Sequence, residues 1–195
     1  SRTRVIEPSY VPGLANEENA LVEALRHPLG VQPLRELVQP DQKVAISVCD
    51  ITRPMPSARV LPVLLDELSH IPRDQIKILV ATGTHRANTP DELDEMLGSE
   101  VVANYQVLNH SAFESGNLTS AGVTSGGLPI SLNSDWLQSD VRITAGFVEP
   151  HFFAGFSGGP KMVATGLAGF DKIMRLHEDH MIGNPRTNGG VNRGI

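Results

Sequence analysis

The sequence contains a single cysteine, Cys49, in 195 residues, and it lacks any long apolar run. One cysteine excludes an internal disulfide framework and is typical of a reducing compartment, so a cytoplasmic location is expected. No apolar stretch approaches the roughly 20 residues of a membrane-spanning helix, and the first ten residues do not resemble a signal peptide. We therefore expect no membrane partner.

Clustered positive charge is absent as well. The formal net charge is -6, and the lysines and arginines are scattered along the chain. A protein that binds nucleic acid usually presents a basic patch, so no nucleic-acid partner is expected. There is also no internal repeat, low-complexity tract or linker, and the length suits one domain with its own apolar core.

Short apolar runs alternate with segments of helical periodicity. Residues 44–49 and 76–83 are apolar and rich in β-branched side chains, which is typical of strands buried on both faces. Further strands are expected at residues 105–109, 128–132 and 141–147, and helices at 57–70, 90–98, 134–138 and 170–183. This alternation predicts an α/β fold: a doubly wound, mostly parallel, Rossmann-like sheet in a single domain.

Polar side chains follow three of these strands. Asp50, Thr52 and Arg53 come after the first strand, His85 after the second, and His151 after the last. Ligands of such sheets bind beyond the carboxyl ends of the strands, so these side chains are expected at one edge. With Arg86, which follows His85, a carboxylate, two arginines and two histidines there would supply charge for an anion and groups that exchange protons near neutral pH.

Each of these residues also has a purely structural interpretation. Asp50 could cap the following turn with Arg53 as its surface partner. His151 lies beside two phenylalanines and could be a core histidine, and Cys49 is expected to fill the core. Their common placement at one edge favours a functional interpretation.

A glycine-rich segment, "HFFAGFSGGPK" (151–161), separates the last strand from a lysine. Glycines between a strand and a helix allow backbone N–H groups to approach an anion, usually a phosphate. The segment is not a Walker loop, because Pro160 precedes Lys161 and Met162 follows it. A desolvated lysine beside a phosphate cradle could also act as a nucleophile and carry a covalent cofactor.

Two histidines lie near the end of the chain, His177 and His180, on the helix expected at 170–183. At this spacing they share one face and could bind a metal, although two histidines of this kind are more often a solvated pair, here beside Glu178 and Asp179. A zinc hydrolase that uses both histidines is the most distant of the functional alternatives.

Several segments resemble the nickel-pincer-nucleotide-dependent lactate racemases. They are "DITRP" (50–54), "ATGTHR" (81–86), "EPHFFAGFSGGPK" (149–161) and His177, sixteen residues after Lys161. Order and spacing agree from about residue 15 to 190. The resemblance implies that residues 1–195 are the N-terminal, cofactor-binding and catalytic domain of such a protein, and that the C-terminal domain, which completes the substrate pocket, is absent from the chain.

The resemblance also implies a cofactor and a role for each residue. Lys161 would tether the nickel-pincer nucleotide, a nickel pyridinium-3,5-bisthiocarboxylic acid mononucleotide, and His177 would bind its nickel. His85 and His151 would be the acid/base pair in a proton-coupled hydride transfer that racemises a small 2-hydroxy acid, with Arg53 binding an anion and Asp50 orienting a histidine or the ribose. The other cofactor contacts would be Thr52, Gly155, Ser157, Gly158 and Gly159. Cofactor-maturation proteins are the partners that this implies.

The chain departs from the family pattern at two places. Thr165-Gly166 stands where the family typically has Pro-Gly after the lysine, and Pro160 replaces a commoner basic residue. Neither change removes a predicted catalytic group. The alternative function is a phosphate- or nucleotide-binding α/β module without turnover in this form.

Overall fold

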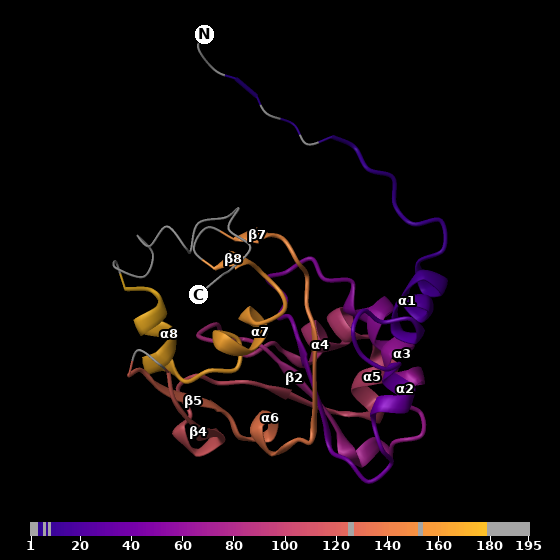
Figure 1. Ribbon diagram of the computed structural model, residues 1–195. Coiled ribbons are helices and arrows are strands. Elements are labelled where there is room, and N and C mark those ends of the chain that lie inside the picture. The colour runs from indigo at the N-terminus through magenta and orange to yellow at the C-terminus, as the bar shows by residue number, and fades with distance from the viewer. Residues whose placement is uncertain (1–3, 6, 8, 125–126, 152–153, 179–195) are drawn as a thin grey trace.

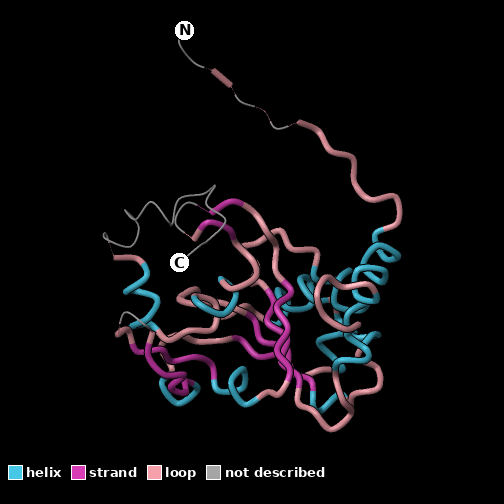
Figure 2. Tube along the Cα trace, in the orientation of Figure 1, coloured by secondary structure: helices cyan, strands magenta, loops and turns pink. Residues whose placement is uncertain are grey.

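Four parallel strands form the central sheet (Figure 1, Figure 2). The computed structural model describes residues 4–5, 7, 9–124, 127–151 and 154–178. The strands are β1 (Val44–Val48), β2 (Ile76–Val80), β3 (Gln106–Asn109) and β6 (Val141–Ala145), in the spatial order β3-β2-β1-β6. Every neighbouring pair in this sheet is parallel. The predicted single-domain α/β fold is confirmed.

Both faces of the sheet are buried, because successive side chains of a strand point to opposite faces. Val44, Ile46 and Val48 of β1 belong to one apolar core, whereas Ala45 belongs to a second. The first core is covered by α1 (Glu17–Arg26), α2 (Leu34–Leu37), α3 (Ser57–Glu67), α4 (Pro90–Leu97) and α5 (Ser99–Asn104). The second is covered by α6 (Ser134–Gln138), α7 (Lys161–Ala164), α8 (Phe170–Leu176) and the antiparallel pair β4 (Leu118–Val123) and β5 (Pro129–Asn133). Figure 1 shows these two groups of elements on opposite sides of the sheet.

The start of α4 follows directly from its sequence. The Thr89 side chain accepts a hydrogen bond from the Glu92 N–H, and the Glu92 carboxylate accepts one from the Thr89 N–H, with Pro90 as the first helical residue. This reciprocal capping satisfies two N–H groups that the helix leaves unpaired. Gly98, with φ of 90°, ends the helix where the sequence predicts.

Several predicted elements differ from the structure in extent or partner. The strand expected at 76–83 ends at Val80, because the Thr82 N–H turns back to the Val80 carbonyl at 2.9 Å, and Gly83 then has φ of 57°, outside the strand region. The strand expected at 128–132 is β5, and it pairs with β4 instead of joining the parallel sheet. The helix expected at 170–183 is α8, which ends at Leu176, and residues from 179 onward lie outside the described part of the chain.

The order of the strands places a crevice at the ends of β1 and β6. From β1 the chain winds to β2 and β3 on one side, whereas β6 lies on the other side of β1. Such a reversal of strand order is where open α/β sheets bind ligands. The short pair β7 (Pro150–His151) and β8 (Gly155–Phe156) follows β6, and Arg73–Gln75 and Ser115–Asn117 form 3₁₀ turns. Among the described residues, no helix combines the length and apolar character needed to cross a membrane.

Candidate active site

A cavity of about 250 Å³ opens at the carboxyl ends of β1, β2 and β6. It brings together residues that are far apart in the sequence. The predicted site residues that line it are Asp50, Thr52, Arg53, His85, His151, Ser157, Gly158, Lys161 and His177. Gly155 and Gly159, which were also predicted as cofactor contacts, do not line it. The convergence predicted from the ends of the strands is therefore present in the structure, while the role of each residue stays a prediction.

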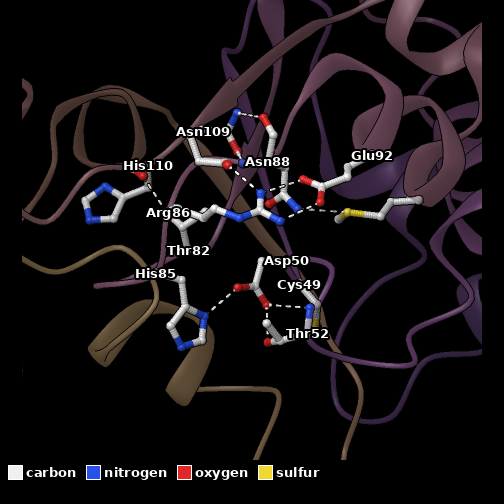
Figure 3. A network of polar contacts seen from close by, with 12 residues as sticks. Cys49, Asp50, Thr52, Thr82, His85, Arg86, Asn88, Glu92, Asn109 and His110 are labelled. Atoms are coloured by element: carbon white, nitrogen blue, oxygen red, sulfur yellow. Dashed lines mark hydrogen bonds and ion pairs between the residues drawn. The ribbon is translucent and has the colours of Figure 1, made fainter.

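Asp50 fixes the orientation of His85 (Figure 3). The Asp50 carboxylate is buried, and its Oδ2 lies 2.6 Å from His85 Nδ1. Its other oxygen accepts a hydrogen bond from the Thr52 hydroxyl at 2.6 Å. With Nδ1–H donating to the carboxylate, the neutral imidazole of His85 carries its lone pair on Nε2. The structure thus gives Thr52 a position beside Asp50, and its contact with a cofactor stays a prediction.

His151 differs from His85 in its surroundings. Its Nδ1 accepts a hydrogen bond from the Ala154 N–H at 3.4 Å. Burial, together with the positive charges of Lys161 and Arg53, lowers the pKa of His151 below its ordinary value. These surroundings favour the neutral ring, and the cavity holds two imidazoles with different partners.

Lys161 is the first residue of α7 and lines the cavity beside Arg53. Burial lowers the pKa of Lys161, and the nearby charge of Arg53 lowers it further. A lowered pKa increases the fraction of neutral amine, which is the nucleophilic form. Cys49, which lines the same cavity, has its pKa raised by burial and packs with its sulfur 3.6 Å from Met162 Sδ, as expected of a core cysteine.

His177 follows the last residue of α8. Its Nδ1 lies 2.7 Å from the carbonyl oxygen of Ile173, to which the Nδ1–H donates. The neutral ring then carries its lone pair on Nε2, as in histidines that bind metals. His180, its predicted companion, lies outside the described residues, and among those described no group of three His, Cys, Asp or Glu side chains is placed to hold a metal.

The glycine-rich segment contains a close backbone approach at Gly158. Its φ is 70°, and a Cβ there would lie 2.9 Å from Val148 Cγ2. The Ser157 hydroxyl donates to the Phe147 carbonyl at 2.6 Å and accepts from the Glu149 N–H at 3.0 Å. Ser157 therefore joins the two sides of this turn, and its contact with a cofactor stays a prediction.

The two arginines expected at this edge have different surroundings. Arg53 lines the cavity, with Nη1 at 3.5 Å from Glu149 Oε1. Arg86 instead makes a two-point contact with Glu92, at 2.7 and 2.6 Å. Figure 3 shows Arg86 directed to Glu92 while the ring of His85 is directed to Asp50. Arg53 is thus the arginine that can meet a ligand in this cavity.

Comparison with known proteins identifies the family. The family model described as "Lactate racemase N-terminal domain" matches residues 1–190. The chain belongs to the lactate racemase N-terminal domain family. It is 37% identical over 177 residues to a lactate racemase from Thermoanaerobacterium thermosaccharolyticum, and 35% identical over 176 residues to one from Lactiplantibacillus plantarum. It covers 42% of the length of each of these relatives.

Solved structures agree with this assignment. The lactate racemase apoprotein from T. thermosaccharolyticum superposes with a TM-score of 0.83 at 37% identity, over 90% of this chain and 42% of that one. A protein from Thermotoga maritima superposes with a TM-score of 0.73 at 24% identity, over 94% of this chain and 46% of that one. The second match, at 24% identity, supports only the fold of this lactate racemase N-terminal domain.

Two contacts that hold the His85 loop were not predicted from the sequence. Asn109, at the end of β3, accepts from the Asn88 N–H at 2.9 Å and donates to the Asn88 carbonyl at 3.0 Å. Gly83 donates from its N–H to the Gly166 carbonyl at 3.0 Å, which joins this loop to the turn that follows Lys161. An asparagine at the end of an edge strand and a glycine two residues before His85 are the available sequence signals.

Gly83→Ala is expected to destabilise this domain by about 1–3 kcal/mol. A Cβ at Gly83 would lie 2.8 Å from the Thr165 carbonyl oxygen, and its φ of 57° is unfavourable for other residues. Urea denaturation measures the loss. Gly116→Ala is the matched control, because among the described residues a Cβ at Gly116 would meet nothing within 4 Å beyond its own chain neighbours, and a change within about 0.5 kcal/mol is expected there. Equal stability of the two variants would contradict the close contact between Gly83 and the Thr165 carbonyl.

Proposed function

We propose that this chain is the cofactor-binding and catalytic domain of a 2-hydroxy-acid racemase or epimerase, with a nickel-pincer nucleotide tethered at Lys161. The observation that carries the proposal is the cavity shared by Lys161, His177, His85 and His151. These are an amine, a metal-binding imidazole and two imidazoles that can exchange protons. The lactate racemases to which the chain is similar support the same activity.

The residues present fit such a cofactor. The partly buried amine of Lys161 has a lowered pKa, as a nucleophile that forms a covalent link requires. His177 has its Nδ1–H bound to the Ile173 carbonyl, which orients the ring for metal binding through Nε2. The backbone turn at Gly158 leaves no room for a side chain where the cavity wall is formed. Lys161 would hold the nucleotide, and His177 its nickel.

The chain's own residues would supply the proton transfers. When bound, the cofactor would accept a hydride from the substrate carbon that bears the hydroxyl. His85, oriented by Asp50, and His151 would each take the hydroxyl proton from one enantiomer and return it in the reverse direction. Two bases are needed because racemisation must run from either enantiomer. Arg53 would bind an anionic group, either the substrate carboxylate or the nucleotide phosphate.

The substrate and partners follow from the same proposal. The substrate is a small 2-hydroxy acid, and cofactor-maturation proteins deliver the nucleotide. The chain spans less than half of its curated relatives, and the remaining part of such a protein would close over the cavity and exclude water.

Mass spectrometry of the chain produced together with the cofactor pathway tests the proposal. A covalent adduct mapped to Lys161, with nickel in excess over zinc, is the expected result. Lys161→Arg should abolish the adduct. Lys172→Arg should keep it, because Lys172 is also a partly buried lysine with a lowered pKa but does not line the cavity. An unmodified chain that binds nucleotide reversibly would instead support a phosphate-binding module, and zinc in place of nickel would support a hydrolase.

A further inference from the structure

Glu149 lies beside Arg53, which lines the cavity, and both backbone polar groups of Glu149 are bonded to Ser157. Its N–H donates to the Ser157 hydroxyl at 3.0 Å, and its carbonyl accepts from the Ser157 N–H at 2.9 Å. The side chain projects from this fixed backbone toward Arg53, with Oε1 at 3.5 Å from Nη1. The Arg53 and Glu149 side chains are 31% and 36% exposed, so a ligand can reach both.

The charge of Glu149 opposes a local excess of positive groups. Lys161 and Arg53 are close enough to lower the pKa of His151, Arg53 also lowers the pKa of Lys161, and the negative charge of Glu149 acts in the opposite direction on both groups. In the described part of the chain, Asp50 is the other carboxylate whose charge acts on Lys161, but it is buried and bound to His85 and Thr52. Glu149 is therefore the carboxylate that balances Arg53 from the solvent side.

We propose that Glu149 is a placeholder for the anionic group of the ligand. Its carboxylate neutralises Arg53 until a phosphate or carboxylate takes that position, and it thereby sets the anion affinity of the cavity. A distance of 3.5 Å is longer than the roughly 2.7–2.9 Å of a charge-assisted hydrogen bond. Partly exposed ion pairs of this kind contribute little stability, so an anion that contacts the guanidinium at two points can displace Glu149 at small cost.

The inference rests on the proposed function only in that Arg53 faces an anionic ligand. The anion could belong to the nucleotide phosphate or to the carboxylate of the hydroxy acid. Both present two oxygens to the guanidinium, so Glu149 would compete with whichever of the two binds at Arg53. The two sources are distinguished by comparing how much the affinity for each anion rises when Glu149 is neutralised.

Calorimetric titration of the chain with inorganic phosphate, and separately with L-lactate, tests the inference at low ionic strength. Glu149→Gln is expected to tighten binding of one of these anions by up to about fivefold, the equivalent of ~1 kcal/mol for an exposed pair. A larger gain for phosphate assigns the position to the nucleotide, and a larger gain for lactate assigns it to the substrate. In an Arg53→Gln background the same change should have no effect, because the two residues act on one position.

Glu36→Gln is the matched control, because it removes the same charge from an exposed position in α2. The inference is overturned if Glu149→Gln tightens anion binding no more than Glu36→Gln does. It is overturned equally if the gain persists without Arg53, or if no variant binds either anion. These binding results need no cofactor, so a missing Lys161 adduct, which would count against the racemase proposal, leaves them unchanged.

Discussion

His85→Ala and His151→Ala are each expected to lower kcat for racemisation by about 10²–10⁴-fold in the cofactor-loaded protein, the range typical of a lost general acid or base. Each imidazole would act as base toward one enantiomer and as acid toward the other. Both variants should therefore show a lower kcat from D to L and from L to D. Racemisation of a panel of D- and L-2-hydroxy acids, followed by chiral chromatography, measures the loss. Retention of the Lys161 adduct in both variants would show that the loss is catalytic.

The pH profile should report the lowered pKa of His151. A base must be unprotonated to accept the hydroxyl proton. Burial, the largest cause of the lowered pKa, and the charge of Arg53 favour the neutral ring and remain when Lys161 carries the cofactor. In the direction that uses His151 as base, the acid limb of kcat/KM is therefore expected below the ordinary histidine pKa of about 6.5.

Full activity in either alanine variant would contradict the two-base mechanism.

His110 provides the control for these substitutions. It is a buried histidine with its Nε2 at 3.0 Å from the Ala168 carbonyl oxygen, and it does not line the cavity. His110→Ala should reduce stability because it leaves buried partners unpaired. If His110→Ala lowers kcat as much as the catalytic variants do, the loss in those variants reflects packing and not proton transfer.

The central sheet and the meeting of its strand ends could be predicted from the sequence. Val44–Val48 is apolar except for Ser47, because β1 is a central strand buried on both faces. Once the strands are parallel, their carboxyl ends share one edge, and the residues that follow them must lie near one another. The cavity formed by Asp50, His85 and His151 is a consequence of that topology.

The hairpin of β4 and β5 could not be predicted in this way. Most of β4 is exposed, and its sequence, "LTSAGV", lacks the apolar alternation that marks a half-buried strand. Its pairing depends on the neighbouring strand and not on its own pattern. The end of α8 at Leu176 was missed for a related reason, because helical periodicity continues in the sequence beyond the residue where the helix ends.

The partners of individual side chains could not be predicted from the sequence either. Arg86 follows His85 directly, yet it turns to Glu92 because α4 begins with a capping box that holds this carboxylate nearby. The contact of Gly83 with Gly166 joins two loops that are distant in the sequence. Such contacts depend on the three-dimensional packing of loops, which local periodicity does not encode.

Asp50→Asn is expected to lower kcat by about 10²–10⁴-fold while KM changes little, because it reverses the tautomer of His85. In the native chain the carboxylate accepts from His85 Nδ1–H over 2.6 Å, which leaves the lone pair on Nε2. An asparagine can direct its amide N–H to Nδ1, and the proton then moves to Nε2, where it blocks proton abstraction. The substitution keeps the size of the buried side chain, so the fold should be retained.

Two measurements distinguish this effect from a structural one. Two-bond ¹H–¹⁵N correlation NMR should show the proton of His85 on Nδ1 in the native chain and on Nε2 in Asp50→Asn. In the cofactor-loaded protein, combining Asp50→Asn with His85→Ala should cost no more than His85→Ala alone, because Asp50 acts through that imidazole. Additive losses in the double variant, or an unchanged tautomer in the single one, would instead assign Asp50 a contact of its own with the substrate or the ribose.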